Sequence, residues 1–176
     1  MLDYAVTLEF DRASHEKLQA LIDQVSAATG CDHMPRMGIP PHVTVSAFRS
    51  EREAELIAAM DDLAAGMHRC ELTLANIGVF NPLVIYVGPV VNEFLMDTCR
   101  QVNARMLPLG EVGNRGRYLP WQWVPHVGIA VKMNPQALRV GFDILQREFT
   151  ACTVTVERIV LARAEPYEPL KTWELL

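Results

Sequence analysis

The feature that most constrains the fold is a tripeptide, Pro-His-Val, that occurs twice, at residues 41–43 and 125–127. Each copy opens a segment rich in β-branched and small apolar residues, which is typical of a strand. The same order of elements surrounds each copy: strand, helix, loop, strand, helix, strand. Because a chance tripeptide match would not bring matching neighbours with it, we interpret the chain as an internal duplication.

Alternating and helical hydrophobic periodicities assign the elements within each half. Strands are predicted over residues 4–10, 42–48, 70–80, 83–87, 123–131 and 153–164, with a short terminal strand at 171–176. Helix starts are predicted at Ser14, at a capping box of Ser50 and Glu53, at Asn92 and at Asn134, with Gly30 ending the first helix. Loops rich in Gly and Pro, at 31–41 and 109–119, lead to the two Pro-His-Val copies.

This pattern predicts an α/β (α+β) fold with two pseudo-symmetric lobes. Each lobe would be an antiparallel-rich sheet with helices on its outer face, and a central cleft would separate the lobes. A chain of 176 residues, half of them hydrophobic, can bury one core but is short for two independently stable domains. We therefore predict a single bilobal domain over residues 1–176, with lobe 1 at approximately 1–80, lobe 2 at approximately 83–165 and a terminal strand at 171–176.

Composition narrows the class of protein. The formal net charge of -5 argues against a broad basic face that coats nucleic acid, although a local basic site remains compatible with it. The four cysteines are scattered, which indicates neither a zinc knuckle nor a disulfide framework. No apolar run approaches the roughly 18 residues of a membrane span. We expect a cytoplasmic protein without a membrane partner, and the oligomeric state is open.

The two histidines, His42 and His126, are the candidate catalytic residues. Residues two apart in a strand share a face, so Thr44 is expected to point the same way as His42. A hydroxyl can donate to a phosphate oxygen, while imidazole exchanges protons near neutral pH. One neutral histidine could take a proton from an attacking hydroxyl or water, and one protonated histidine could donate to the leaving oxygen. This chemistry needs no metal or cofactor, and no metal-ligand spacing occurs near either residue.

Both segments resemble the paired H-x-[TS]-x motifs of the 2H phosphoesterase superfamily: Pro41-His42-Val43-Thr44-Val45 and Pro125-His126-Val127-Gly128-Ile129. The resemblance extends to the branch of 2′-5′ RNA ligases and cyclic phosphodiesterases through Ile77-Gly78-Val79-Phe80, Leu83 to Pro89, Leu161-Ala162-Arg163 and Trp173. It covers nearly the whole chain. It implies that the substrate is an RNA end or a cyclic nucleotide.

Gly128 departs from this pattern, because Thr or Ser is expected there. A lost hydrogen bond to a charged oxygen could cost about 1.5–3 kcal/mol, or one to two decades in rate, if nothing replaces it. Activity would then be slow rather than absent. Alternatively, Gly128 opens space or exposes a backbone N–H for a bulkier phosphorylated ligand, since glycine in a strand often marks a close approach.

Further side chains are candidates for binding substrate and also have simple structural explanations. Tyr86 aligns with Thr7 in the repeat and could offer a phenol to a ligand or form a wall. Tyr118 and Trp123 precede the second motif and could stack a base, or they could pack. The loop arginines Arg36, Arg115 and Arg117 could bind flanking phosphates or could be solvated.

The sequence therefore predicts a metal-independent phosphoesterase that hydrolyses 2′,3′-cyclic phosphates, joins RNA ends through a 2′-5′ linkage, or does both. Microscopic reversibility lets the same groups run either direction. The alternative is a module that binds an RNA end or nucleotide without turnover, with Gly128 marking lost catalysis. A third hypothesis is a purely structural or partner-binding protein. The two nearly symmetric motifs do not reveal which histidine is the acid.

Overall fold

All strands of the protein belong to one antiparallel sheet. The computed structural model describes residues 1–176 and contains the strands β1 (Leu2–Phe10), β2 (His42–Ser50), β3 (Cys70–Phe80), β4 (Val84–Pro89), β5 (Glu111–Val112), β6 (Val127–Ala130), β7 (Cys152–Arg163) and β8 (Glu168–Glu174). They pair in the order β1-β2-β6-β4-β3-β7-β8, with β5 beside β2. An additional pairing between β1 and β7 returns the sheet to its first strand. The predicted mixed α+β class is confirmed.

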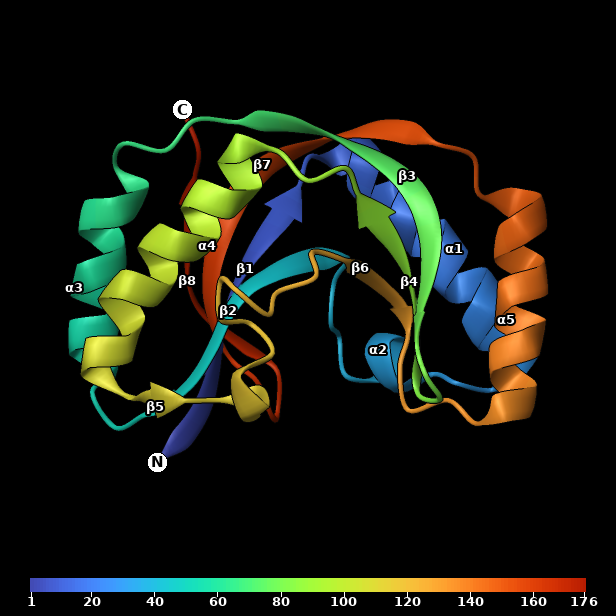
Figure 1. The fold of residues 1–176 in the computed structure, drawn as a ribbon, viewed down its shortest axis with the longest axis horizontal. Helices are drawn as coiled ribbons and strands as arrows, with labels where there is room; N and C mark the ends of the chain where they lie inside the picture. The colour runs from blue at the N-terminus through green and yellow to red at the C-terminus, as the bar shows by residue number, and fades with distance from the viewer.

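Two helix pairs flank the strands on opposite sides (Figure 1). The helices are α1 (Arg12–Thr29), α2 (His33–Arg36), α3 (Glu53–Ala64), α4 (Glu93–Met106) and α5 (Pro135–Glu148). Helix α1 contacts α5 and β6, while α4 contacts α3 and β2, so helices of each half of the sequence lie beside strands of the other half. The division into lobes at about residues 80 and 165 stays a prediction, and these helix contacts cross it.

The first helix shows why the chain forms a helix here. Leu18, Ile22 and Val25 are buried at helical spacing, and Gly30 ends the helix with a φ of 71°, a left-handed conformation that glycine adopts without strain. The start differs from the prediction. Asp11 caps the helix by accepting from the Ser14 backbone N–H, because it precedes the first turn. The Ser14 hydroxyl instead accepts from the Thr155 N–H on β7.

The predicted capping box of Ser50 and Glu53 is also wrong. The residue before α3 is Arg52, and it makes no side-chain cap. Ser50 Oγ accepts from the Arg52 N–H and donates to the Leu109 carbonyl, so it ties β2 to the loop after α4. The Glu53 carboxylate accepts from the Arg163 guanidinium instead. The caps predicted for the other helices are confirmed: Asn92 accepts from the Leu95 N–H, and Asn134 accepts from two N–H groups of α5.

Several boundaries differ from the sequence prediction. The loop 31–41 contains the short helix α2, and the loop 109–119 contains β5. Strand β6 begins at Val127 rather than at residue 123, because Trp123 turns inward and donates its Nε1–H to the Thr44 carbonyl. The terminal strand begins at Glu168, three residues before the predicted start, since β8 pairs with the C-terminal half of β7, from Arg158 to Arg163.

Strand β1 separates the core from the face that carries the site. Val6, Leu8 and Phe10 are fully buried in the hydrophobic core, and Thr7 and Glu9 point to the opposite face of the strand.

No helix is both long enough and apolar enough to span a bilayer.

Candidate functional site

The two Pro-His-Val segments meet at the junction of β2 and β6. A single residue pair, Val43 with Val127, joins these strands, and the pairing is antiparallel. This register places His42 opposite Gly128 and Thr44 opposite His126, because opposing residues step in reverse order. Val43 and Val127 are buried on the other face, so the four motif residues share one face of the sheet. The pairing of β2 with β6 therefore brings the two motifs side by side, as their predicted convergence requires.

Both imidazoles are oriented in the same way. His42 Nδ1 lies 2.8 Å from the Pro40 carbonyl oxygen, and His126 Nδ1 lies 2.8 Å from the Val124 carbonyl oxygen. A carbonyl oxygen only accepts, so in each neutral ring Nδ1 carries the hydrogen. In both copies a proline stands between the carbonyl and the histidine, and its fixed φ holds that turn. Each Nε2 is left free to exchange a proton.

Both histidines have pKa values below the ordinary value. For His42 the main cause is burial, which disfavours the charged ring, and it outweighs the Pro40 carbonyl and the Glu9 carboxylate, which raise the pKa. For His126 burial again dominates over the Val124 carbonyl, and the charge on His42 lowers the pKa further. The two rings therefore interact electrostatically.

Three aromatic rings surround His126. Phe80 meets it edge-on with ring centroids 4.8 Å apart, Tyr86 lies at 5.4 Å, and Tyr118 is stacked at 6.3 Å. The Tyr86 ring lies across Gly78 of β3, where any Cβ would collide with it. Gly78 is thus required for Tyr86 to take this position beside His126.

Tyr118 also borders Thr44, and burial raises the pKa of its phenol while the nearby Thr44 hydroxyl lowers it in part. The backbone of this loop is held by Asn103 of α4, which is 3% exposed. Asn103 Nδ2 donates to the carbonyls of Tyr118 and Val45, and its Oδ1 accepts from the Ser46 hydroxyl. Asn103 was not among the residues predicted from the sequence, although an amide beside the apolar face of a helix is a detectable signal.

The repeat equivalence of Tyr86 and Thr7 agrees with the strand registers. Thr7 pairs with Thr44 on β2, and Tyr86 pairs with Gly128 on β6. Thr7 Oγ1 is buried and has no hydrogen-bond partner.

The position of Gly128 is open: a Cβ there would meet only Met34 Sδ, at 3.8 Å, an ordinary contact.

The remaining candidate residues are not gathered around the histidines. Trp123 is 8% exposed and bonded to the Thr44 carbonyl, so it buttresses β2. Arg36 pairs with Asp32 on α2, at 3.4 Å. Arg115 and Arg117 are exposed on the loop before β6. Nothing in the structure gives these three arginines a contact with the motif residues.

Two surface hollows have linings that include neither histidine of the pair. One of about 490 Å³ lies between α4 and the exposed Trp121, and its lining includes Arg100 and Asn103. A second of about 250 Å³ is lined by side chains that include His33, Lys132 and Tyr167. No three His, Cys, Asp or Glu side chains are placed so that they could hold a metal ion.

The sequence and the fold are similar to those of known proteins. The sequence matches the 2′-5′ RNA ligase superfamily over residues 11–168. Similar solved structures are Escherichia coli LigT complexed with 3′-AMP (16% identity, 99% of this chain and 98% of that chain, TM-score 0.64) and TT0787 of Thermus thermophilus (17%, 99% and 98%, 0.64). Usb1 of Kluyveromyces marxianus is also similar (15%, 98% and 98%, 0.57). No curated protein matches the sequence. The match extends over most of the chain and includes both histidine motifs, so the protein belongs to the 2′-5′ RNA ligase superfamily.

Proposed function

We propose that the protein is a metal-independent phosphoesterase that opens 2′,3′-cyclic phosphates on RNA ends or small nucleotides. One observation carries the proposal: both histidines fix Nδ1 on a backbone carbonyl, which leaves two free Nε2 atoms on one face of the sheet. A site that must take one proton and give another needs two such groups. The 2′-5′ ligation of RNA ends would use the same groups in reverse.

In this mechanism one neutral Nε2 takes a proton from a water molecule whose oxygen attacks phosphorus. The bond between phosphorus and one ribose oxygen breaks, and that oxygen takes the proton of the other, protonated imidazole. Thr44, opposite His126, donates its hydroxyl to a non-bridging phosphate oxygen as negative charge develops there. The open backbone at Gly128 would face the other side of the phosphoryl group. Tyr86 and Tyr118 would line the approach of the ribose.

Nucleotide complexes of similar structures support this class of substrate. LigT of Escherichia coli has been solved with 3′-AMP, with ATP, with NADP+ and with phosphate. By analogy, a phosphate attached to a nucleoside would bind on the face between the histidines of this chain.

The proposal is tested with a panel of 2′,3′-cyclic nucleotides and RNA oligonucleotides that end in a cyclic phosphate, in the presence of EDTA. We expect conversion of at least one of them to a phosphomonoester. Turnover that requires an added divalent cation would contradict the mechanism.

A missing phosphate donor at Gly128 favours one other function, a binding module. Tight nucleotide binding with no turnover of any panel member would establish that module.

The rate should have an acidic pH optimum. One ring must be neutral and the other protonated, so kcat/KM peaks between the pKa values of the pair. Burial lowers both pKa values below the ordinary value of about 6.5, which moves both limbs of the profile toward acid. We expect a bell-shaped profile with its maximum below about pH 6.5. Measurement of kcat/KM on a cyclic nucleotide from about pH 5 to about pH 8 checks this, and a rate still rising above neutrality would contradict it.

Replacement of Gly128 by threonine should increase activity. The site accepts a Cβ without a clash, and the new hydroxyl would restore a donor to the phosphate, worth about 1.5–3 kcal/mol. We expect kcat/KM to rise by about one to two decades at most. Gly128→Val is the matched control, since it adds the same bulk without the hydroxyl. Equal losses in both variants would show that Gly128 provides space and not a vacant donor position.

A further inference from the structure

The two halves of the site differ at the residue that faces each histidine. On β1, Glu9 pairs directly with His42. On β4, Val87 pairs with Val127, so the next residue in register, Gly88, stands opposite His126. The space above Gly88 is occupied by the neutral Asn76 amide. Thus a carboxylate faces one imidazole, and a glycine covered by an amide faces the other.

Glu9 is held in place from both sides. It pairs with His42 on β2 and with Arg158 on β7, so the three side chains form a row across three neighbouring strands. Cβ atoms of such direct neighbours are about 4.5–5.5 Å apart. One carboxylate oxygen lies 3.7 Å from Arg158 Nε, and the other accepts from the Tyr167 hydroxyl at 3.3 Å. The Glu9 side chain is only 13% exposed, so water screens its charge weakly.

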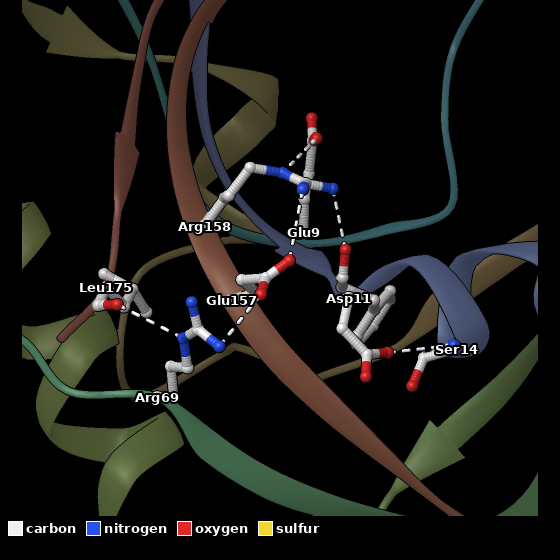
Figure 2. A network of polar contacts seen from close by, with 8 residues as sticks. Glu9, Asp11, Ser14, Arg69, Glu157, Arg158 and Leu175 are labelled. Carbon is white, nitrogen blue, oxygen red and sulfur yellow. Dashed lines mark hydrogen bonds and ion pairs between the residues drawn. The ribbon is translucent and has the colours of Figure 1, made fainter.

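A longer network anchors Arg158 (Figure 2). The Arg158 guanidinium donates to the Phe10 carbonyl at 2.7 Å and to Glu157 at 3.4 Å. Glu157 pairs in turn with Arg69 at 3.0 Å, and Arg69 donates to the Leu175 carbonyl. The charged members of this network are two acids and two arginines, Glu9, Glu157, Arg69 and Arg158, so their charges sum to zero. Glu9 is the member that stands beside the histidine, so its negative charge favours the protonated form of His42.

No other carboxylate faces the pair. From β1, the charged neighbour of His42 is Glu9. His126 on β6 lies opposite Thr44, diagonally from His42, and the two rings interact through their charges. Arg158 and Tyr167 contact Glu9. His126 is surrounded by the rings of Phe80, Tyr86 and Tyr118. The Glu9 carboxylate raises the pKa of His42, whereas the charge on His42 lowers the pKa of His126.

We propose that Glu9 is a positioning residue that makes His42 the imidazole that carries the proton and leaves His126 as the proton acceptor. This inference rests on the proposed phosphoesterase function. In hydrolysis, His126 Nε2 takes a proton from the attacking water, and the oxygen of that water bonds to phosphorus. The bond from phosphorus to the ribose oxygen breaks, and His42 Nε2 protonates that oxygen. A proton has then moved from one ring to the other through the reactants, and exchange with solvent restores the pair.

The test is Glu9→Gln, which keeps the shape of the side chain and removes its charge. In the ligand-free protein, NMR titration of the imidazole C–H signals should show the His42 midpoint moving to lower pH, with the signal assigned by its loss in His42→Gln. On a cyclic nucleotide, the alkaline limb of kcat/KM should move to lower pH together with the His42 midpoint, so that activity at about pH 7 falls in proportion to that movement. Glu148→Gln, at an exposed position on α5 outside this network, should leave both unchanged. Glu9→Asp should restore the alkaline limb.

The outcomes separate the two proposals. An unmoved His42 midpoint in a folded Glu9→Gln protein would overturn the role of Glu9, whatever the activity. Movement of the acid limb in place of the alkaline limb would reverse the assignment of acid and base. Absence of turnover in the wild-type protein, with the His42 midpoint shifting as expected, would overturn the phosphoesterase and leave the electrostatic role of Glu9 standing.

Discussion

Replacement of either histidine, His42→Ala or His126→Ala, is expected to lower kcat/KM for a 2′,3′-cyclic phosphate by about 10²–10⁴-fold. Each variant removes one of the two proton transfers, and the remaining ring cannot supply both in one turnover. Because the rings act as a unit, the double variant should lose little more than either single variant. Steady-state hydrolysis of one cyclic nucleotide by the three variants measures this.

His68→Ala provides the matched control, since His68 is exposed and lies apart from the motifs. It should retain wild-type activity. Nucleotide binding, followed as a thermal shift, should persist in His42→Ala and His126→Ala because Thr44 and the surrounding rings remain. If either variant kept most of its activity with its fold intact, the exchange of protons between the two histidines would be wrong.

Asn103→Ala is expected to lower the free energy of unfolding by about 2–4 kcal/mol. The substitution deprives the buried carbonyls of Val45 and Tyr118, and the Ser46 hydroxyl, of their amide partner. It also releases the loop that places Tyr118 against His126. The fall in kcat/KM should therefore exceed the fraction of the protein that is unfolded at the assay temperature. Urea unfolding followed by circular dichroism gives the stability change.

Gln101→Ala is the control on the same helix, because Gln101 is exposed. Its unfolding free energy should stay within about 0.5 kcal/mol of the wild-type value. Equal stability of the Asn103→Ala and Gln101→Ala proteins would show that the amide network contributes nothing net to folding.

The elements of the fold could be predicted from the sequence because each has a local signal. Alternation locates β1, and helical periodicity with Asn92 and Asn134 caps locates two helices. The packing of α1 beside β6 and of α4 beside β2 has no local signal, since it depends on contacts between distant segments. The caps at Ser14 and Ser50 failed for a related reason: each hydroxyl bonds to a distant strand or loop.

The site could be predicted in part. Two histidines at matching places in a repeat predicted a shared site, and strand alternation added Thr44. Glu9 could not be identified, because its relation to His42 comes from the register of β1 against β2. Phe80 was overlooked for a similar reason, as its ring reaches His126 from another strand. Register and side-chain reach are tertiary properties.

The most direct test of hydrolysis by the two histidines is to follow 2′,3′-cyclic AMP by ³¹P NMR with the wild-type protein in EDTA. We expect the cyclic phosphate signal to give way to that of a single phosphomonoester, at the same rate with and without EDTA, and we expect His42→Ala to abolish the change. A cyclic signal that persists while the nucleotide demonstrably binds, or an opening that EDTA stops, would contradict hydrolysis by the two histidines.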